Sequence, residues 1–306
     1  YCFKFDKQIS NKWNSNWGDE GNWKTERIAD NKDDAIKMPW QIIPIWSAIP
    51  ENLNHLSVFN QDEFNVSTII KHEKLDELKD SLVDLFSKSQ IILFLRSKQI
   101  KITINTTQKL VLEKTIIHDD IATIKQNNLI TSEWLIKNEQ FDIPKDIQSK
   151  IRNDNRYPRK LRESQRTEVS FAVQLEKGRL KPADEDKRLI FTFLPTSINY
   201  GLPFLVNANF LTDAGRESIH KDLEWNQWLF TQIPIKYFEW ISDLANLNSK
   251  FNRQFITVLP QKLNGFNALE SKFNEGYKTA IESIAFIPNQ QGKLIKVADA
   301  IYDETN

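Results

Sequence analysis

The sequence has few glycines, a single cysteine and no long hydrophobic run, and each shortage excludes a class of protein. Cys2 alone cannot form an intramolecular disulfide or a cysteine-based metal site, and it suits a reducing compartment, so we expect a cytoplasmic protein. A membrane span would need about 18 consecutive apolar residues, and neither such a run nor a signal peptide is found. The chain begins with Tyr1 rather than methionine, which favours a segment of a longer polypeptide.

The sequence also has no excess of positive or negative charge. The 306 residues include 41 Lys and Arg and 41 Asp and Glu, so the net charge is +0 and no overall field attracts a polyanion. We therefore expect neither nucleic acid nor a membrane surface as a partner. Hydrophobic residues make up 40% and charged residues 27%, which is the composition of a folded protein, and the length suits about two domains.

The patterns of common catalytic sites are missing as well. The eight glycines form neither GxGxxG nor GxxxxGK[ST], the arrangements that close a backbone around phosphates, and no GxSxG nucleophile turn is present. The histidines lack the spacing of metal ligands. They are His55, His72, His118 and His220. We expect no metal site and no self-contained nucleotide-binding loop.

Alternating and apolar segments predict a sheet in the middle of the chain. Residues 1–6 and 64–72 are typical of strands, and the apolar run at 90–95 leads into an alternating strand at 98–104. Further extended segments are expected at 109–117, 132–144, 167–176, 189–195 and 203–210.

Three segments have the apolar spacing of helices. The first covers residues 73–88, where Leu75, Leu78, Leu82 and Phe86 share one face. The second covers 222–246, with Pro234 marking a break or kink, and the third covers 267–284. We expect the first helix to lie across a sheet and the helical segment 222–246 to cover one face of the central sheet.

The remaining segments are expected to be loops and a hairpin. Residues 7–36 are polar but contain Trp13, Trp17 and Trp23, which favours a surface loop held by its tryptophans. Three prolines exclude a helix over 39–50. Residues 285–303 predict a hairpin with Gly292 at its turn.

The stretch RNDNRYPRKLRESQR (152–166) is the one strongly basic segment. Its cations could meet phosphates, but Tyr157 is its only aromatic residue and the chain is neutral overall. A solvated helix and loop is the favoured interpretation, and nucleic-acid binding is the alternative, for which affinity would fall steeply with salt.

Residues 188–230 contain the strongest candidate for a functional residue. Two expected strands lead to the turn AGRE and then to a helix, so Arg216 would lie on a loop at the edge of the sheet. A guanidinium is permanently charged and can bond two phosphate oxygens at once. The structural alternative is a surface ion pair of Arg216 with Glu217 or Asp213.

This block resembles the middle region of sacsin and its bacterial relatives, which carry an ATP-binding domain like that of the ninety-kilodalton heat-shock chaperone. The family pattern is a strand ending in LP, a GLP turn, a further strand, an arginine turn and a WN pair that opens a helix. The matching residues are Leu194, Pro195, Gly201, Leu202, Pro203, Asn209, Phe210, Arg216, Trp225 and Asn226.

The resemblance implies an α+β protein with mixed sheets packed by helices. Residues 1–106 would be the end of an ATP-binding sandwich, residues 107–258 a transducer-like βαβ domain, and residues 259–306 a helix and hairpin extension. In the gyrase, heat-shock chaperone, histidine kinase and MutL (GHKL) superfamily, the transducer sends a basic residue to the γ-phosphate of ATP, and Arg216 is the candidate for it.

The resemblance also implies ATP and Mg²⁺ as cofactors, although the motifs that hold them, DxGxG and GxxGxG, are absent and would precede Tyr1. ATPase activity is expected only together with that upstream part. The expected function is a coupling module of a sacsin-like ATPase, in a chaperone-like or phage-defence protein of bacteria. The partners would be the rest of the polypeptide, a protein client and, as a candidate assembly, a second copy.

The alternative function is a nucleotide-independent scaffold. In it, the tryptophans at 13–23 and those of the helix around Trp225, Trp228 and Trp240 would be exposed and would bind protein surfaces.

Overall fold

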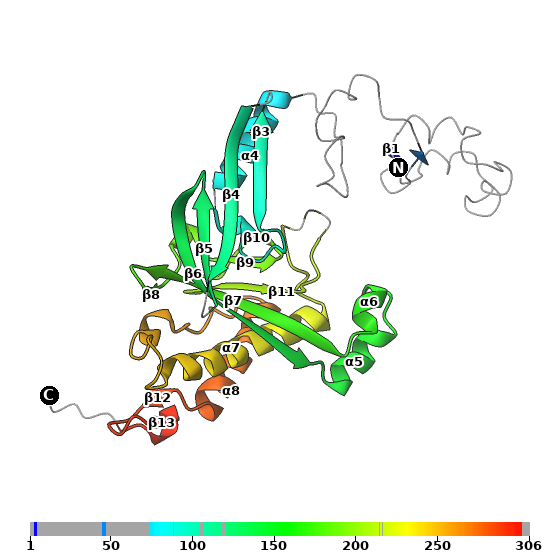
Figure 1. The fold of residues 1–306 in the computed structure, drawn as a ribbon. Coiled ribbons are helices and arrows are strands. Elements are labelled where there is room, and N and C mark those ends of the chain that lie inside the picture. Colours follow the sequence, from blue (N-terminus) through cyan, green and yellow to red (C-terminus); the bar gives the residue numbers. More distant parts are fainter. Residues whose placement is uncertain are drawn as a thin grey trace. The chain divides into compact units, whose positions relative to one another are not determined.

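Alternation of apolar and polar residues along the middle of the chain builds one large sheet in the computed structural model (Figure 1). The structure describes residues 74–301, except 88, 105, 106, 118, 119, 214 and 216, together with two short strands nearer the N-terminus. The chain divides into two units, Tyr1–Glu73 and Lys74–Asn306. In the first unit, β1 (Phe3–Lys4) pairs antiparallel with β2 (Ile45–Trp46).

Several predicted features lie outside the described residues. They are the loop over 7–36 with its three tryptophans, the strand over 64–72, Cys2, His55, His72 and His118. β1 falls within the strand predicted at 1–6, and β2 falls within the segment rich in proline.

The second unit contains a nine-stranded sheet within its described residues, in the order β10-β9-β11-β7-β6-β5-β4-β3, with β8 paired to β7. The strands are β3 (Gln99–Ile104), β4 (Thr107–Ile117), β5 (Ile121–Gln126), β6 (Leu129–Asp142), β7 (Arg166–Glu176), β8 (Arg179–Lys181), β9 (Leu189–Thr192), β10 (Leu194–Asn199) and β11 (Leu205–Ala208). β11 runs parallel to β9, and the other described pairs are antiparallel. The sheet is therefore mixed.

Both faces of β7 are buried, because this strand lies in the middle of the sheet between two hydrophobic cores. Phe171 points into the larger core with the long helices, and its neighbour Ala172 points into the smaller core on the opposite face. The smaller core also receives Ile92 from the apolar run at 90–95 and Leu82 from the first helix. The strand alternation thus builds two layers around one sheet.

Helices cover the sheet and one of its ends (Figure 1). They are α4 (Leu75–Ser87), α5 (Lys145–Arg152), α6 (Arg159–Arg162), α7 (Glu224–Ala245) and α8 (Ala268–Ser283), with short 3₁₀ helices η5 (Ser89–Ile92), η6 (Glu185–Lys187), η7 (Phe255–Val258) and η8 (Val297–Asp299). A final hairpin pairs β12 (Ile287–Pro288) with β13 (Leu294–Ile295). None of the described helices is both long and apolar enough to cross a membrane.

α7 is the main helix of the larger core, and its aromatic side chains interlock with those of the sheet. The Tyr237 ring stacks on Phe204 at 3.6 Å between centroids and meets Phe171 edge-on at 5.2 Å. Its hydroxyl donates to the Val258 carbonyl at 3.0 Å, so the polar end of this fully buried ring is satisfied. Burial raises the pKa of Tyr237 well above its ordinary value.

α8 crosses α7 at the turn that contains Pro234. A Cβ atom on Gly276 would lie 2.0 Å from the Thr231 carbonyl oxygen and 2.9 Å from the Pro234 ring. The two backbones approach this closely only because Gly276 has no side chain. Proline removes one backbone donor from the helix but also presents a flat apolar surface to the crossing.

The α+β class is confirmed, and most strands and helices predicted within the described residues fall at or near observed elements. Pro234 does not break the helix, since α7 is continuous from Glu224 to Ala245, and the alternative of a kink stays a prediction. The spacing of apolar residues in the sequence predicts neither β5 nor β8. The domain boundaries at residues 106 and 258 stay predictions, and β3 and β4 pair across the first of them.

Gly276→Ala is expected to lower the free energy of unfolding by about 3 kcal/mol, because a rigid backbone carbonyl occupies the space that the new methyl group needs. Helix propensity alone would make the alanine variant more stable by about 1 kcal/mol. A loss of stability would therefore show that the close approach of the two helices outweighs propensity. Urea unfolding measures it. Gly215→Ala is the matched control, since its Cβ would meet nothing closer than 3.7 Å; equal stability of the two variants would contradict the close crossing.

Candidate functional site

The segment around Arg216 forms a short hairpin between β11 and α7. Arg216 itself lies outside the described residues, whereas the chain on both sides of it is described. Thr212 and Ile219 form an antiparallel bridge, and the Asp213 N–H donates to the Ser218 carbonyl at 3.0 Å. The Asp213 carboxylate accepts the Glu217 N–H at 3.0 Å, which closes the turn.

The hairpin is attached to the edge of the sheet. The Ser197 N–H of β10, the outermost strand on this side, donates to the Glu217 carbonyl at 3.1 Å. The residues beside Arg216 therefore lie where the sequence predicts them, at a sheet edge. The structure does not test whether Arg216 pairs with Asp213 or Glu217.

The side chain of Asn226 holds both strands of this hairpin. Its Oδ1 accepts the Leu211 N–H at 2.9 Å, and its Nδ2 donates to the carbonyls of Leu211 and His220 at 2.8 Å each. Asn226 is fully buried in the first turn of α7. A buried amide with three partners has little freedom to move, so the start of α7 fixes the base of the hairpin.

Trp225 fixes the chain just before the hairpin. Its indole Nε1 donates to the Asn209 carbonyl at 2.8 Å, and its ring is fully buried. The WN pair of the sequence thus has a definite structural role: both side chains bind backbone groups of the segment that leads into and out of the arginine turn.

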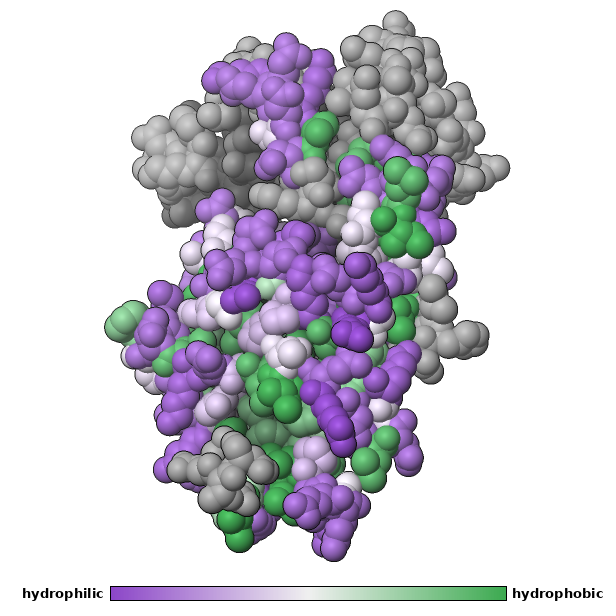
Figure 2. Space-filling view, turned by 90° about the vertical axis from the view of Figure 1, so that its left-hand side faces the viewer, coloured by the Kyte–Doolittle hydropathy of each residue, from purple (hydrophilic) through white to green (hydrophobic). Residues whose placement is uncertain are grey.

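The helical tryptophans do not form a protein-binding surface. Trp225, Trp228 and Trp240 are 0%, 9% and 4% exposed. The tryptophans at 13–23 lie outside the described residues. Figure 2 shows one face of the molecule, where hydrophilic side chains cover most of the described surface and hydrophobic ones form smaller groups. The tryptophans of α7 are therefore not available to bind other proteins, as the scaffold hypothesis would require.

The GLP turn lines a hollow of about 550 Å³ between β10 and the segment before α8. Gly201 has φ +71°, its N–H is accepted by Asn199 Oδ1 at 2.8 Å, and the Pro203 carbonyl accepts the Ala183 N–H at 2.9 Å. Burial raises the pKa of Tyr200 in this hollow, and the charge of Glu270 raises it further. These bonds give the GLP motif a role in shaping the connection to β11.

Among the described residues, no three His, Cys, Asp or Glu side chains lie close enough together to hold a metal ion. The basic stretch divides into paired and unpaired cations. Arg156 binds Asp154 at 2.7 Å, Arg159 binds Glu163 at 2.7 Å, and Arg166 binds Asp142 at 3.1 Å.

Comparison with known proteins gives one partial similarity. A 60-residue segment is 33% identical to the protein NO VEIN of Arabidopsis thaliana, and it amounts to 20% of this chain but only 2% of the plant protein. No family model matches the chain. No solved structure matches it. The resemblance to the sacsin family therefore stays a hypothesis that rests on the motif residues.

Asn226→Ala is expected to lower the free energy of unfolding by about 3 kcal/mol, because it removes three hydrogen bonds made by one fully buried side chain and leaves the Leu211 N–H without its acceptor. Chemical unfolding measures the loss. Gln227→Ala is the control: the neighbouring amide makes one bond, to the Lys221 carbonyl at the surface, and its loss should cost less than about 1 kcal/mol. Similar losses in the two variants would contradict the special role of Asn226.

Proposed function

We propose that this chain couples ATP hydrolysis to a conformational change, and that Arg216 contacts the γ-phosphate of the nucleotide. The observation that carries the proposal is the attachment of the hairpin around Arg216 to the first turn of α7 through Asn226. An arginine on a firmly attached turn can report the presence of a phosphate to the helix behind it.

The described residues alone do not fit a complete ATP site. They include no glycine-rich phosphate loop and no group of acidic residues that could hold Mg²⁺. ATP and Mg²⁺ would be bound by a part of the protein outside the described residues. The contribution of this chain would be one cation, which stabilises charge at the transferred phosphate.

α7 would carry the signal away from the hairpin. The helix extends over 22 residues, and its buried side contacts the sheet through Tyr237 and α8 through Gly276. A shift of the hairpin would therefore move α7 together with the layers packed on it. From the resemblance to the sacsin family, we infer that the conformational change is passed to a protein client. We also infer that the whole protein acts in the cytoplasm, in a chaperone-like or antiviral role.

The test is ATP turnover by the natural full-length gene product. Arg216→Ala is expected to lower kcat about 100-fold, because one positioned donor at a developing phosphate charge contributes on this scale. Nucleotide binding, followed by a thermal shift, should change much less. Full turnover in the variant would overturn the role of Arg216, and a full-length protein that neither binds nor hydrolyses ATP would overturn the proposed function.

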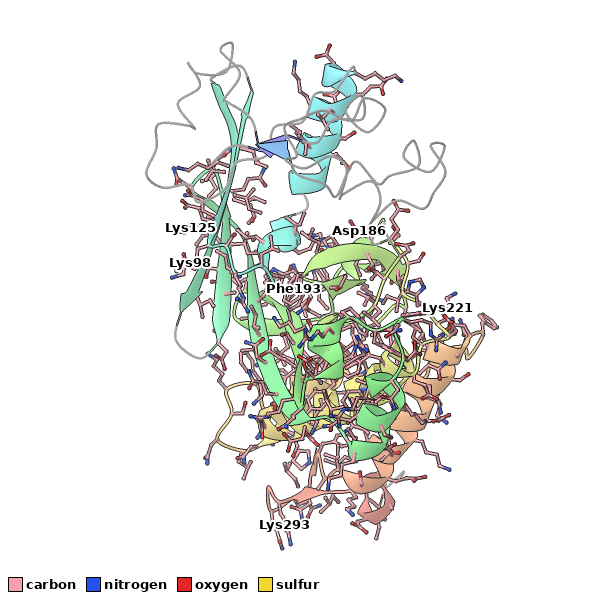
Figure 3. The ribbon with its side chains drawn as sticks, turned by 90° about the vertical axis from the view of Figure 1, so that its right-hand side faces the viewer. Lys98, Lys125, Asp186, Phe193, Lys221 and Lys293 are labelled. Atoms are coloured by element: carbon pink, nitrogen blue, oxygen red, sulfur yellow. The ribbon has the colours of Figure 1, made fainter. Side chains whose placement is uncertain are left out.

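Lys221→Ala is the matched control. Lys221 is an exposed cation just after the hairpin (Figure 3), and the structure gives its side chain no part in holding the turn. Its removal changes the net charge by the same amount as Arg216→Ala. Turnover should stay within about twofold of the parent protein, since an exposed charge that does not touch the phosphate contributes little.

A further inference from the structure

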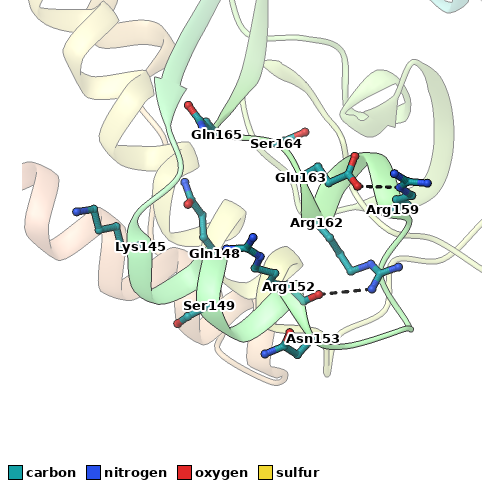
Figure 4. A pocket seen from close by; sticks show the side chains of 10 residues that line it. All are labelled: Lys145, Gln148, Ser149, Arg152, Asn153, Arg159, Arg162, Glu163, Ser164 and Gln165. Atoms are coloured by element: carbon teal, nitrogen blue, oxygen red, sulfur yellow. Dashed lines mark hydrogen bonds and ion pairs between the residues drawn. The ribbon is translucent and has the colours of Figure 1, made fainter.

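A hollow of about 780 Å³ lies between α5, α6 and the chain that leads into β7 (Figure 4). This volume is in the usual range of small-molecule sites. All its lining residues are polar or charged. They are Lys145, Gln148, Ser149, Arg152, Asn153, Arg159, Arg162, Glu163, Ser164 and Gln165.

The two faces of α5 explain how these residues come together. Lys145, Gln148, Ser149 and Arg152 follow the i, i+3, i+4, i+7 spacing of one helical face, and all four line the hollow. Ile147 and Ile151 lie on the opposite face and are buried in the larger core. The core therefore fixes the helix, and Gln148 and Arg152 lie between Lys145 on one side and the residues of α6 on the other (Figure 4).

The hollow is strongly cationic although the chain as a whole is neutral. Four cations and one carboxylate line it, and the carboxylate of Glu163 is paired with Arg159 at 2.7 Å. Within the described residues, Lys145, Arg152 and Arg162 form no ion pair. The charge of Arg162 also acts on the nearby Asp154 carboxylate, whose pKa it helps to lower, but the cations that line the hollow outnumber the carboxylates, and the local field favours an anion.

Arg162 adds a donor that lacks an acceptor. Its Nη1 makes two long contacts, to the Arg152 carbonyl at 3.4 Å and to Asn155 Oδ1 at 3.3 Å. Its Nε is buried and has no partner among the described residues. A buried N–H without an acceptor is costly, and an oxygen atom of a bound anion would satisfy it.

We propose that this hollow binds a small phosphorylated ligand, with Arg152 and Arg162 contacting its phosphate oxygens and Lys145 adding charge. Arginine forms paired hydrogen bonds with phosphate, which suits two guanidinium groups on one site. The volume exceeds that of a single phosphate, so the ligand would carry two phosphates or an organic part. The site is separate in sequence from Arg216 and does not depend on the proposed ATPase role.

The test is calorimetric titration of the chain with inorganic pyrophosphate at low salt. We expect saturable binding with a dissociation constant below about 1 mM, which weakens as salt is added. Arg152→Gln should weaken it at least about tenfold without affecting folding, since this side chain is exposed and makes no bond in the described structure. Arg162→Lys keeps the charge but loses Nε and the planar fork, and it should also weaken binding.

Lys160→Gln is the matched control, because Lys160 belongs to the same helix as Arg162 but does not line the hollow. It should leave the dissociation constant unchanged. Equal weakening in this variant, or no saturable binding of pyrophosphate, would overturn the proposal. Tighter binding of a single-stranded oligonucleotide than of pyrophosphate, lost in Arg152→Gln, would overturn it in favour of a nucleic-acid surface.

Discussion

The buried amide of Asn226 is the interaction on which the functional half of this structure depends. One side chain in the first turn of α7 satisfies backbone groups on both strands of the hairpin around Arg216. Because a buried amide is costly to leave unpaired, the hairpin and the helix are joined as one body. The bond from Ser197 to Glu217 then ties this body to the edge of the sheet.

The segment that forms the α5–α6 hollow also contacts the start of α7. Lys150 of α5 pairs with Glu224 at 3.2 Å, and Tyr157, which follows α5, is buried against the backbone at the start of α7. At its other end, α7 is locked to the sheet by Tyr237 and to α8 by the close approach at Gly276. A ligand that reached either the hairpin or the α5–α6 hollow would therefore act on the same helix.

Sequence patterns predict most of this fold because periodicity records which faces are buried. The pattern finds the strands with clear alternation and the helices with apolar stripes. It misses β5, whose hairpin turn is formed by Asn127 and Asn128 rather than by the usual pair that contains glycine. Both asparagines have positive φ, as a two-residue hairpin turn requires. The sequence predicts a loop at the sheet edge for Arg216, and the described residues on both sides of it form a hairpin there. The attachment of this hairpin through Asn226 and the hollow at Arg152 are not predicted, because both depend on side-chain contacts in irregular segments, which periodicity does not record.

Hydrogen exchange at the hairpin in the natural full-length protein tests the central claim most directly. The backbone N–H groups of residues 211–220 should exchange more slowly with a non-hydrolysable ATP analogue bound than with ADP bound, while those of Phe171 in the middle of β7 stay unchanged in both states. The same exchange rates at the hairpin with the analogue, with ADP and without nucleotide would contradict the account, because the hairpin would then not respond to the γ-phosphate.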